Sequence, residues 1–222
     1  MNLHSEVLAR LVTLDTDAGL AELDAAGLST VENAKELALH ALDTAEANST
    51  NAYQILSLAS ALSQSLGSPP ALRGQIDYAQ ARIYLQNGHL SLAETALRSA
   101  QSAWREAEDS ASVTRSRLGL TQILTLQGRY AEAEQSCRLT ISELQSRTED
   151  QPPQSVAANL VSLMVAYNNL SAQLLYQERY ADAIAEADSA LTQIEALLAN
   201  ATLDPFTGQQ LRYWQGYLLI NK

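Results

Sequence analysis

The sequence of 222 residues predicts an all-α protein built from antiparallel helix pairs. Apolar residues recur at helical spacing along most of the chain, and polar turns separate the recurring runs. The composition is 46% hydrophobic but only 5% aromatic, so alanine and leucine supply most of the apolar surface, which favours closely packed helices over a sheet. The turn signals Gly88, Gly128 and Glu178 follow one another at intervals of 40 and 50 residues, which indicates a repeating two-helix unit.

The clearest helix pair lies between residues 167 and 191. Its first helix carries an apolar face, and a second helix resumes such a face after a polar turn at Glu178 and Arg179. The two faces consist of Tyr167, Leu170, Leu174 and Leu175, then of Tyr180, Ala183, Ala187, Ala190 and Leu191. Because residues without bulk let two helix backbones approach closely, Ser171 and the alanines predict the seam of a tight hairpin.

Two short helices are predicted at the start of the chain, over about residues 2–14 and 16–26. Gly27 ends the second of them. Both are rich in leucine and alanine but match the later pattern poorly. Residues 1–28 are therefore interpreted as an N-terminal helical cap, since the end of a helix stack needs a polar outer face.

A first helix pair is predicted over about residues 29–48 and 51–66. Ser29 and Glu32 form a capping box at its start, in which each side chain bonds to a free backbone N–H. Gly67, followed by two prolines, ends the pair in the manner of a glycine C-cap.

The second and third helix pairs turn at Gly88 and Gly128. Ala93 and Ala133 follow these glycines at the same distance, so both pairs are predicted to have the alanine seam in the same phase. A longer helix over about residues 154–177 then leads into the clearest pair.

A last helix is predicted to begin at Pro205, and it forms only half of a further hairpin. An incomplete hairpin exposes an apolar face, so the chain is expected to be the N-terminal part of a longer protein or to associate with itself through this helix. The alternative is that this helix is itself the C-terminal cap. The residues that favour an uncovered surface are Tyr213, Trp214, Tyr217 and Ile220.

The order of residues in the stretch 167–191 resembles a tetratricopeptide repeat (TPR): an aromatic residue, Leu, a small residue, Leu, a polar turn, Tyr and spaced alanines. The intervals between turns exceed the usual TPR period of ~34 residues, so the resemblance is to the long-helix variety. It covers residues 29–222. It implies a right-handed superhelical α-solenoid of antiparallel hairpins, with about ten or eleven helices in the whole chain.

Long-helix repeats of this kind occur in kinesin light chains, in maltose-regulator-like bacterial signalling proteins and in bacterial proteins that join TPRs to a CHAT peptidase domain. The stretch 52–75, AYQILSLASALSQSLGSPPALRGQ, is similar to the last two groups. The resemblance implies a non-catalytic module that binds proteins or peptides, as the N-terminal sensor or scaffold part of a larger bacterial protein.

The acidic charge balance argues against a nucleic-acid partner. The formal net charge is −11, and the only lysines are Lys35 and Lys222, whereas a protein that tracks phosphates needs a basic stripe. The acidic residues are interpreted as a solvated surface, with a basic partner as the alternative. No apolar run reaches the ~18–20 residues of a membrane span, and the N-terminus lacks a signal-peptide pattern. No membrane association and a cytoplasmic location are therefore expected.

No constellation of residues in the sequence predicts catalysis, a metal or a cofactor. His4, His40 and His89 are scattered, without the spacing of metal ligands. No Gly-rich phosphate loop or nucleophile elbow is present. The single cysteine, Cys137, is expected to be a small buried hydrophobe, with a reactive thiol as the alternative. We expect the protein not to be an enzyme.

The family resemblance places the candidate peptide-binding residues on the first helix of each pair, which lines the concave surface of such solenoids. These residues are Tyr78, Arg82, Gln86, Arg115, Gln122, Thr125, Asn168, Ala172, Tyr176, Tyr213 and Tyr217. Asn and Gln can bond to a peptide backbone, Tyr supplies contact area and Arg binds carboxylates. Chaperone-binding TPRs hold a terminal carboxylate with Lys and Asn, where this chain has Tyr78 and Arg82, so that mode is not expected.

Alternatives to this site are open at the level of the sequence. Asn168 and Asn169 can pack or cap locally, and the tyrosines can fill the core in part. The whole chain can also be a structural spacer or an oligomerisation arm whose groove holds no ligand. A sensor of a small molecule or peptide pheromone is a third possibility, although no DNA-binding helix-turn-helix precedes the repeats.

Overall fold

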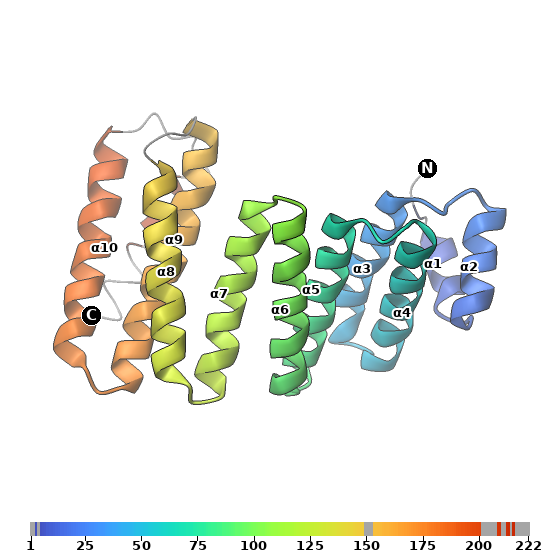
Figure 1. Cartoon of the computed structure of the whole chain (residues 1–222), viewed down its shortest axis with the longest axis horizontal. Coiled ribbons are helices and arrows are strands. Elements are labelled where there is room, and N and C mark those ends of the chain that lie inside the picture. Colours follow the sequence, from blue (N-terminus) through green and yellow to red (C-terminus); the bar gives the residue numbers. More distant parts are fainter. Residues whose placement is uncertain are drawn as a thin grey trace. The chain divides into compact units, whose positions relative to one another are not determined.

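The computed structural model describes residue 3, residues 5–148 and 153–200, and positions 208, 209, 212, 213 and 215. All secondary structure in these ranges is helical, which confirms the all-α class. The helices within the two long ranges are α1 (Ser5–Leu11), α2 (Thr16–Ala25), α3 (Val31–Ala45), α4 (Ser49–Ser65), α5 (Pro70–Gln86), α6 (Leu90–Glu106), α7 (Ser110–Leu126), α8 (Tyr130–Thr148), α9 (Pro153–Tyr176) and α10 (Tyr180–Asn200) (Figure 1).

The turns predicted at Gly88, Gly128 and Glu178 are confirmed, and each has the same geometry. All three residues have a positive φ, of 75°, 74° and 59° respectively. In each turn the N–H of the next residue bonds to a carbonyl five residues back, for example from His89 to Tyr84 at 2.9 Å. This is the Schellman motif, which satisfies free carbonyls at a helix end. Glycine adopts this left-handed conformation without steric cost, whereas Glu178 adopts it at a cost.

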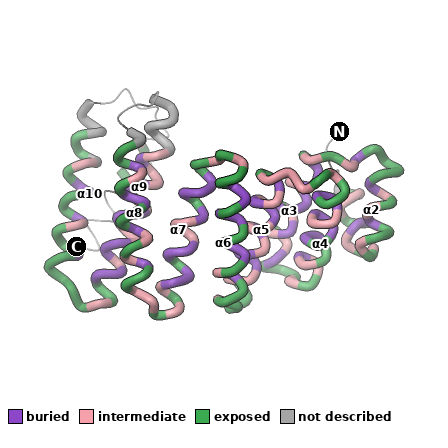
Figure 2. The backbone as a smooth tube through the Cα atoms, in the orientation of Figure 1, coloured by how far each residue is buried: buried purple, intermediate pink, exposed green. Residues whose placement is uncertain are grey.

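The chain forms two compact units, residues 1–116 and 117–222, and the division falls within α7. In the first unit α3 packs against α4, α5 packs against α6, and α5 also packs against both α3 and α4. The cap helices share this core, because Leu11 and Leu23 belong to the same buried cluster as α3, α4 and α5. Figure 2 shows buried positions alternating with exposed ones along these helices. The predicted domain boundary at residue 28 stays a prediction.

A glycine and a tryptophan determine how closely α5 and α6 approach each other. The Trp104 side chain is only 2% exposed and lies over Gly74. A Cβ atom at Gly74 would stand 2.6 Å from Cδ1 and Nε1 of the indole ring. The ring of Tyr78 also packs against Trp104, with the two ring centroids 5.5 Å apart. Only glycine at this position leaves room for the ring.

In the second unit α9 packs against α8 and against α10. Tyr167 of α9 is 4% exposed, and its hydroxyl accepts hydrogen bonds from Gln145 of α8 at 3.1 Å and Gln193 of α10 at 2.7 Å. The predicted seam is confirmed in this unit, because Ala133 and Ala183 are buried. Ala93 is buried in the same way within the first unit.

An ion-pair network joins α8 to the start of α10. Arg138 bonds to Glu134 on its own helix at 3.0 Å and to Glu186 on α10 at 2.8 Å. Arg179, in the turn before α10, bonds to the other oxygen of Glu134 at 2.8 Å and also to Asp182. Glu134 therefore connects two arginines, and its own side chain is only 14% exposed.

Several sequence expectations need correction. The N-cap of α3 is Thr30 instead of Ser29, because the Asn33 N–H bonds to the Thr30 hydroxyl at 3.2 Å and the helix begins one residue later. Leu175 and Tyr180 were predicted on buried faces but are exposed. Both lie next to the α9–α10 turn, where the neighbouring helix no longer covers them. The predicted last helix from Pro205 lies largely outside the described residues.

Candidate functional site

In the first unit the predicted binding residues Arg82, Gln86 and Arg115 all point into solvent from first helices. Arg82 and Gln86 lie on α5 and Arg115 on α7, and each side chain is exposed. None of the three side chains forms a hydrogen bond or ion pair with another described residue. By contrast, Arg73 and Arg98 of the same unit each pair with a carboxylate. The structure therefore leaves two guanidinium groups and an amide available to a partner.

Tyr78 behaves differently from the three exposed residues. Its side chain is half-buried, and its ring packs on Trp104 at the 5.5 Å centroid distance given above. Together with Ala100 and Val113 these two rings form a small apolar cluster of α5, α6 and the start of α7. Tyr78 thus fills part of the core, which was the alternative open for the tyrosines, and only its remaining surface can contact a partner.

In the second unit the predicted residues divide between exposed and partly covered positions. Gln122 of α7 is exposed and Asn168 of α9 is half-buried, and neither forms a hydrogen bond with another described residue. Thr125 and Ala172 are half-buried, and the Thr125 hydroxyl accepts a hydrogen bond from Gln173 at 2.6 Å. This hydrogen bond joins α9 to α7, so Thr125 has a structural role.

Tyr176 is the predicted residue with the most distinct environment. It is 59% exposed, and its ring stacks on that of Tyr130, with centroids 5.2 Å apart and planes 11° from parallel. Tyr130 begins α8 and was not selected from the sequence as a binding residue. Tyr213 is 65% exposed, and Tyr217 lies outside the described residues.

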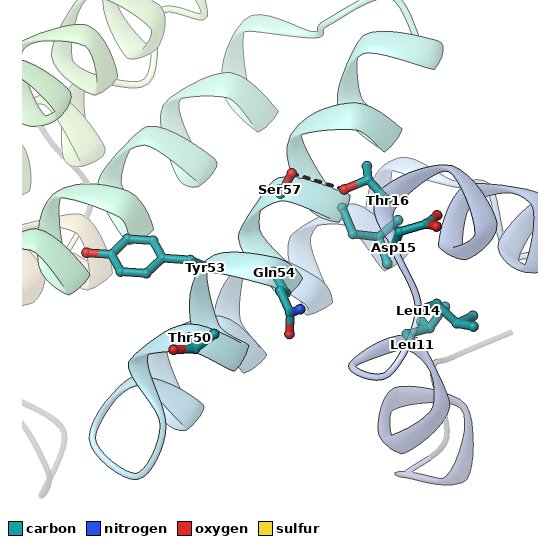
Figure 3. A pocket seen from close by; sticks show the side chains of 9 residues that line it. Leu11, Leu14, Asp15, Thr16, Thr50, Tyr53, Gln54 and Ser57 are labelled. Carbon is teal, nitrogen blue, oxygen red and sulfur yellow. Dashed lines mark hydrogen bonds between the residues drawn. The ribbon is translucent and has the colours of Figure 1, made fainter.

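A cleft of about 470 Å³ in the first unit was not predicted from the sequence (Figure 3). It lies between α4 and the end of α1 with the following turn. Its apolar wall comes from three leucines, and its polar wall comes mainly from one face of α4. The lining residues are Leu11, Leu14, Asp15, Thr16, Thr50, Tyr53, Gln54, Ser57 and Leu58. The only feature of the sequence that relates to this cleft is the short length of the two cap helices. Their length does not show which part of α4 they cover.

Titratable groups in both units have a pKa that burial raises. Burial raises the pKa of the Cys137 thiol to about 12, and the thiol donates a weak hydrogen bond to the Thr121 hydroxyl, at 3.9 Å. The prediction of a buried hydrophobe is confirmed for this residue. Burial also raises the pKa of Asp77, although a hydrogen bond from Ser99 and the charge of Arg73 partly offset this. Within the described ranges no three His, Cys, Asp or Glu side chains gather as a metal site.

The sequence matches no protein-family model and none of the curated proteins with which it was compared. No helix in the described part of the chain is both long enough and apolar enough to cross a membrane.

Proposed function

We propose that the protein is a TPR-like α-solenoid that binds another protein or a peptide through exposed polar side chains on its first helices. The helix pairing in the first unit supports the solenoid, since α5 packs against both helices of the preceding pair as stacked hairpins do. The long helices and the left-handed turn residues agree with the long-helix variety of this family. A cytoplasmic location fits the single buried cysteine.

The observation that carries the proposal is the pair of unpartnered arginines, Arg82 and Arg115. In a chain with 25 acidic residues, a guanidinium group on the surface readily finds a carboxylate, as Arg73, Arg98 and Arg138 do. Two arginines on first helices without such a partner are available for the carboxylates of a ligand. Gln86 of the same unit, also exposed and unpartnered, can bond to the ligand's backbone.

An array of peptides that includes acidic sequences tests this function. Peptides that bind the wild-type protein are expected to lose about tenfold or more in affinity when Arg82→Ala and Arg115→Ala are combined. Arg98→Ala is the matched control, because Arg98 lies on α6 and pairs with Glu94 of the same helix. Unchanged affinity of the double variant, or an equal loss in the control, would contradict the proposal.

Self-association is a second candidate function, and a specific feature of the second unit favours it. Among the described residues, most of the exposed large apolar side chains lie in this unit. They are Leu126, Leu139, Leu175, Tyr176, Tyr180, Ile184 and Tyr213. Light scattering over a range of protein concentrations distinguishes the two functions, since an oligomerisation arm gives a concentration-dependent mass and a peptide-binding monomer does not.

A further inference from the structure

The cleft in Figure 3 exists because the cap helices are shorter than the helix they cover. α2 has 10 residues and α4 has 17, which correspond to lengths of ~15 Å and ~25 Å at a rise of ~1.5 Å per residue. α2 packs against the part of α4 around Leu58, where Gly19 permits a close approach. A contact of 3.2 Å between the hydroxyls of Thr16 and Ser57 marks the edge of the covered part.

Toward the start of α4, beyond that edge, one face of the helix is open. Thr50 and Gln54 lie on this face and are exposed, and their side chains have no hydrogen-bond partner among the described residues. In Figure 3 the Gln54 amide lies between α4 and the leucines of the cap, whereas the Tyr53 ring turns away from them. That ring packs instead against Tyr84 of α5, with centroids 5.8 Å apart. The open face therefore presents a hydroxyl and an amide above an apolar wall.

The spacing of these two polar groups matches an extended peptide. Residues four apart on a helix lie one turn apart, with a distance of about 5–6 Å between their Cβ atoms. In an extended strand, groups on the same side recur every second residue, at about 6.6 Å. One strand can thus bond to Thr50 and Gln54 together. The volume of about 470 Å³ lies within the roughly 300–1,000 Å³ of ligand pockets.

The net charge of the helices that form or neighbour the cleft selects the sign of the ligand. Residues 5–46, which include all of α1, α2 and α3, contain nine acidic residues and only two basic ones, Arg10 and Lys35. Both basic residues already pair with carboxylates, at 2.6 Å and 3.6 Å. Residues 47–72, which include α4, carry no charged side chain. Asp15 lines the cleft itself; one of its carboxylate oxygens caps α2 by accepting a hydrogen bond from the Ala18 N–H at 2.8 Å, and the other oxygen has no partner among the described residues. A cationic ligand is therefore attracted to the cap side of the cleft, and an anionic one is repelled.

The apolar wall selects the other property of the ligand. Leu11 and Leu58 are almost fully buried, at 4% and 3% exposure, and their edges together with Leu14 face the cleft. Leu14 is only partly buried, so an aliphatic side chain placed there would remove apolar surface of Leu14 from water as well as its own. In an extended strand every second side chain points to the same side. An aliphatic residue and a basic residue two positions further along therefore lie on the same side of the strand.

We propose that this cleft binds an extended segment of a partner protein in which aliphatic and basic residues alternate with small polar ones. An aliphatic side chain lies against Leu11, Leu14 and Leu58, the backbone bonds to Thr50 and Gln54, and a basic side chain faces Asp15. This site is separate from Arg82 and Arg115, so the two binding functions can succeed or fail independently.

Fluorescence anisotropy of the whole chain with a labelled peptide, Lys-Thr-Leu-Thr-Leu-Thr-Lys, tests the proposal at about 0.15 M salt. Saturable binding is expected. The same peptide with both lysines replaced by Glu, or both leucines replaced by Ser, is expected to bind at least about tenfold more weakly. Absence of saturable binding of the first peptide up to about 1 mM would overturn the proposal.

Variants of α4 distinguish the cleft from general attraction to an acidic surface. Thr50→Ala combined with Gln54→Ala is expected to weaken binding about tenfold or more, since two hydrogen bonds are lost. Gln64→Ala, at an exposed position of the same helix outside the cleft, is the matched control and is expected to bind normally. Equal affinity of the double variant and the wild type would overturn the proposal. Both variants change exposed residues, and circular dichroism verifies that they fold.

Discussion

Substitution of Gly74 by alanine tests whether Trp104 determines the distance between α5 and α6. In a helix without neighbours this change stabilises, because alanine exceeds glycine in helix propensity by about 1 kcal/mol. Here the new Cβ would lie 2.6 Å from two atoms of the indole ring and 2.9 Å from a third. Ordinary carbon contacts are about 3.5–4.0 Å, so the ring must move by about 1 Å.

The ring has little freedom for such a movement. Trp104 is 2% exposed, and Tyr78 packs against it on the side of α5. Overpacking of a filled core costs about 1–3 kcal/mol, and a rigid ring places this site at the upper end. After the gain in propensity is subtracted, we expect Gly74→Ala to lower the free energy of unfolding by about 1–2 kcal/mol.

A double-mutant cycle measured by urea denaturation and circular dichroism separates the clash from other effects. In a Trp104→Leu background the flexible side chain leaves room for the methyl group, so Gly74→Ala should be neutral or stabilise by up to about 1 kcal/mol. Gly19→Ala is the matched control, because its Cβ would meet only the tip of Leu58, at 3.0 Å. A neutral or stabilising effect of Gly74→Ala in the wild-type background would refute the reasoning.

Three further predictions concern other parts of the chain. Ala133→Leu should lower the free energy of unfolding by about 1–3 kcal/mol in chemical denaturation, because the position is buried in the seam. Ala131→Leu, at an exposed position of the same helix, should have almost no effect. Equal effects of the two substitutions would contradict the seam. Cys137 should react with a thiol reagent only after unfolding, because burial raises its pKa to about 12, and rapid reaction of the native protein would contradict its burial. Burial raises the pKa of Glu134, but hydrogen bonds from Arg138 and Gln177 and the charges of Arg179 and Arg138 outweigh this and hold it below the ordinary value of 4.5. The ionised Glu134 therefore stabilises the fold above pH 4.5, and this contribution is lost as the pH falls through the lower native pKa. Glu134→Gln should lower the free energy of unfolding by about 1 kcal/mol at pH 7, and this difference should shrink on acidification; a difference independent of pH would contradict the network.

The sequence predicted the helices and their turns well because these depend on local signals. Helical spacing of apolar residues located the hairpins, and Gly88, Gly128 and Glu178 located three turns whose left-handed geometry the structure confirms. The burial of Ala93 and Ala133 followed from the same phase. These features depend on residues that lie within about one helical turn or one loop of each other in the sequence.

Features that depend on contacts between distant residues were not predicted. The fit of Trp104 over Gly74 needs the axial register of α5 and α6, which periodicity does not determine. The two-arginine network around Glu134 joins residues about 45 positions apart, and in sequence it looks like an ordinary helix pair of charges. The cleft beside Gln54 arises from a difference in helix length between cap and hairpin. Tyr180 is exposed because it lies next to the α9–α10 turn, where the neighbouring helix no longer covers it.

Photo-crosslinking tests the central functional claim most directly. A benzoylphenylalanine at position 86, on first helix α5, is compared with one at position 92, an exposed leucine on return helix α6. Each protein is irradiated with the tightest acidic peptide from the array. A peptide bound along the first helices should cross-link from position 86 and not from position 92, and Arg82→Ala with Arg115→Ala should abolish the product. Cross-linking from position 92 alone, or equally from both positions, would contradict the proposed function.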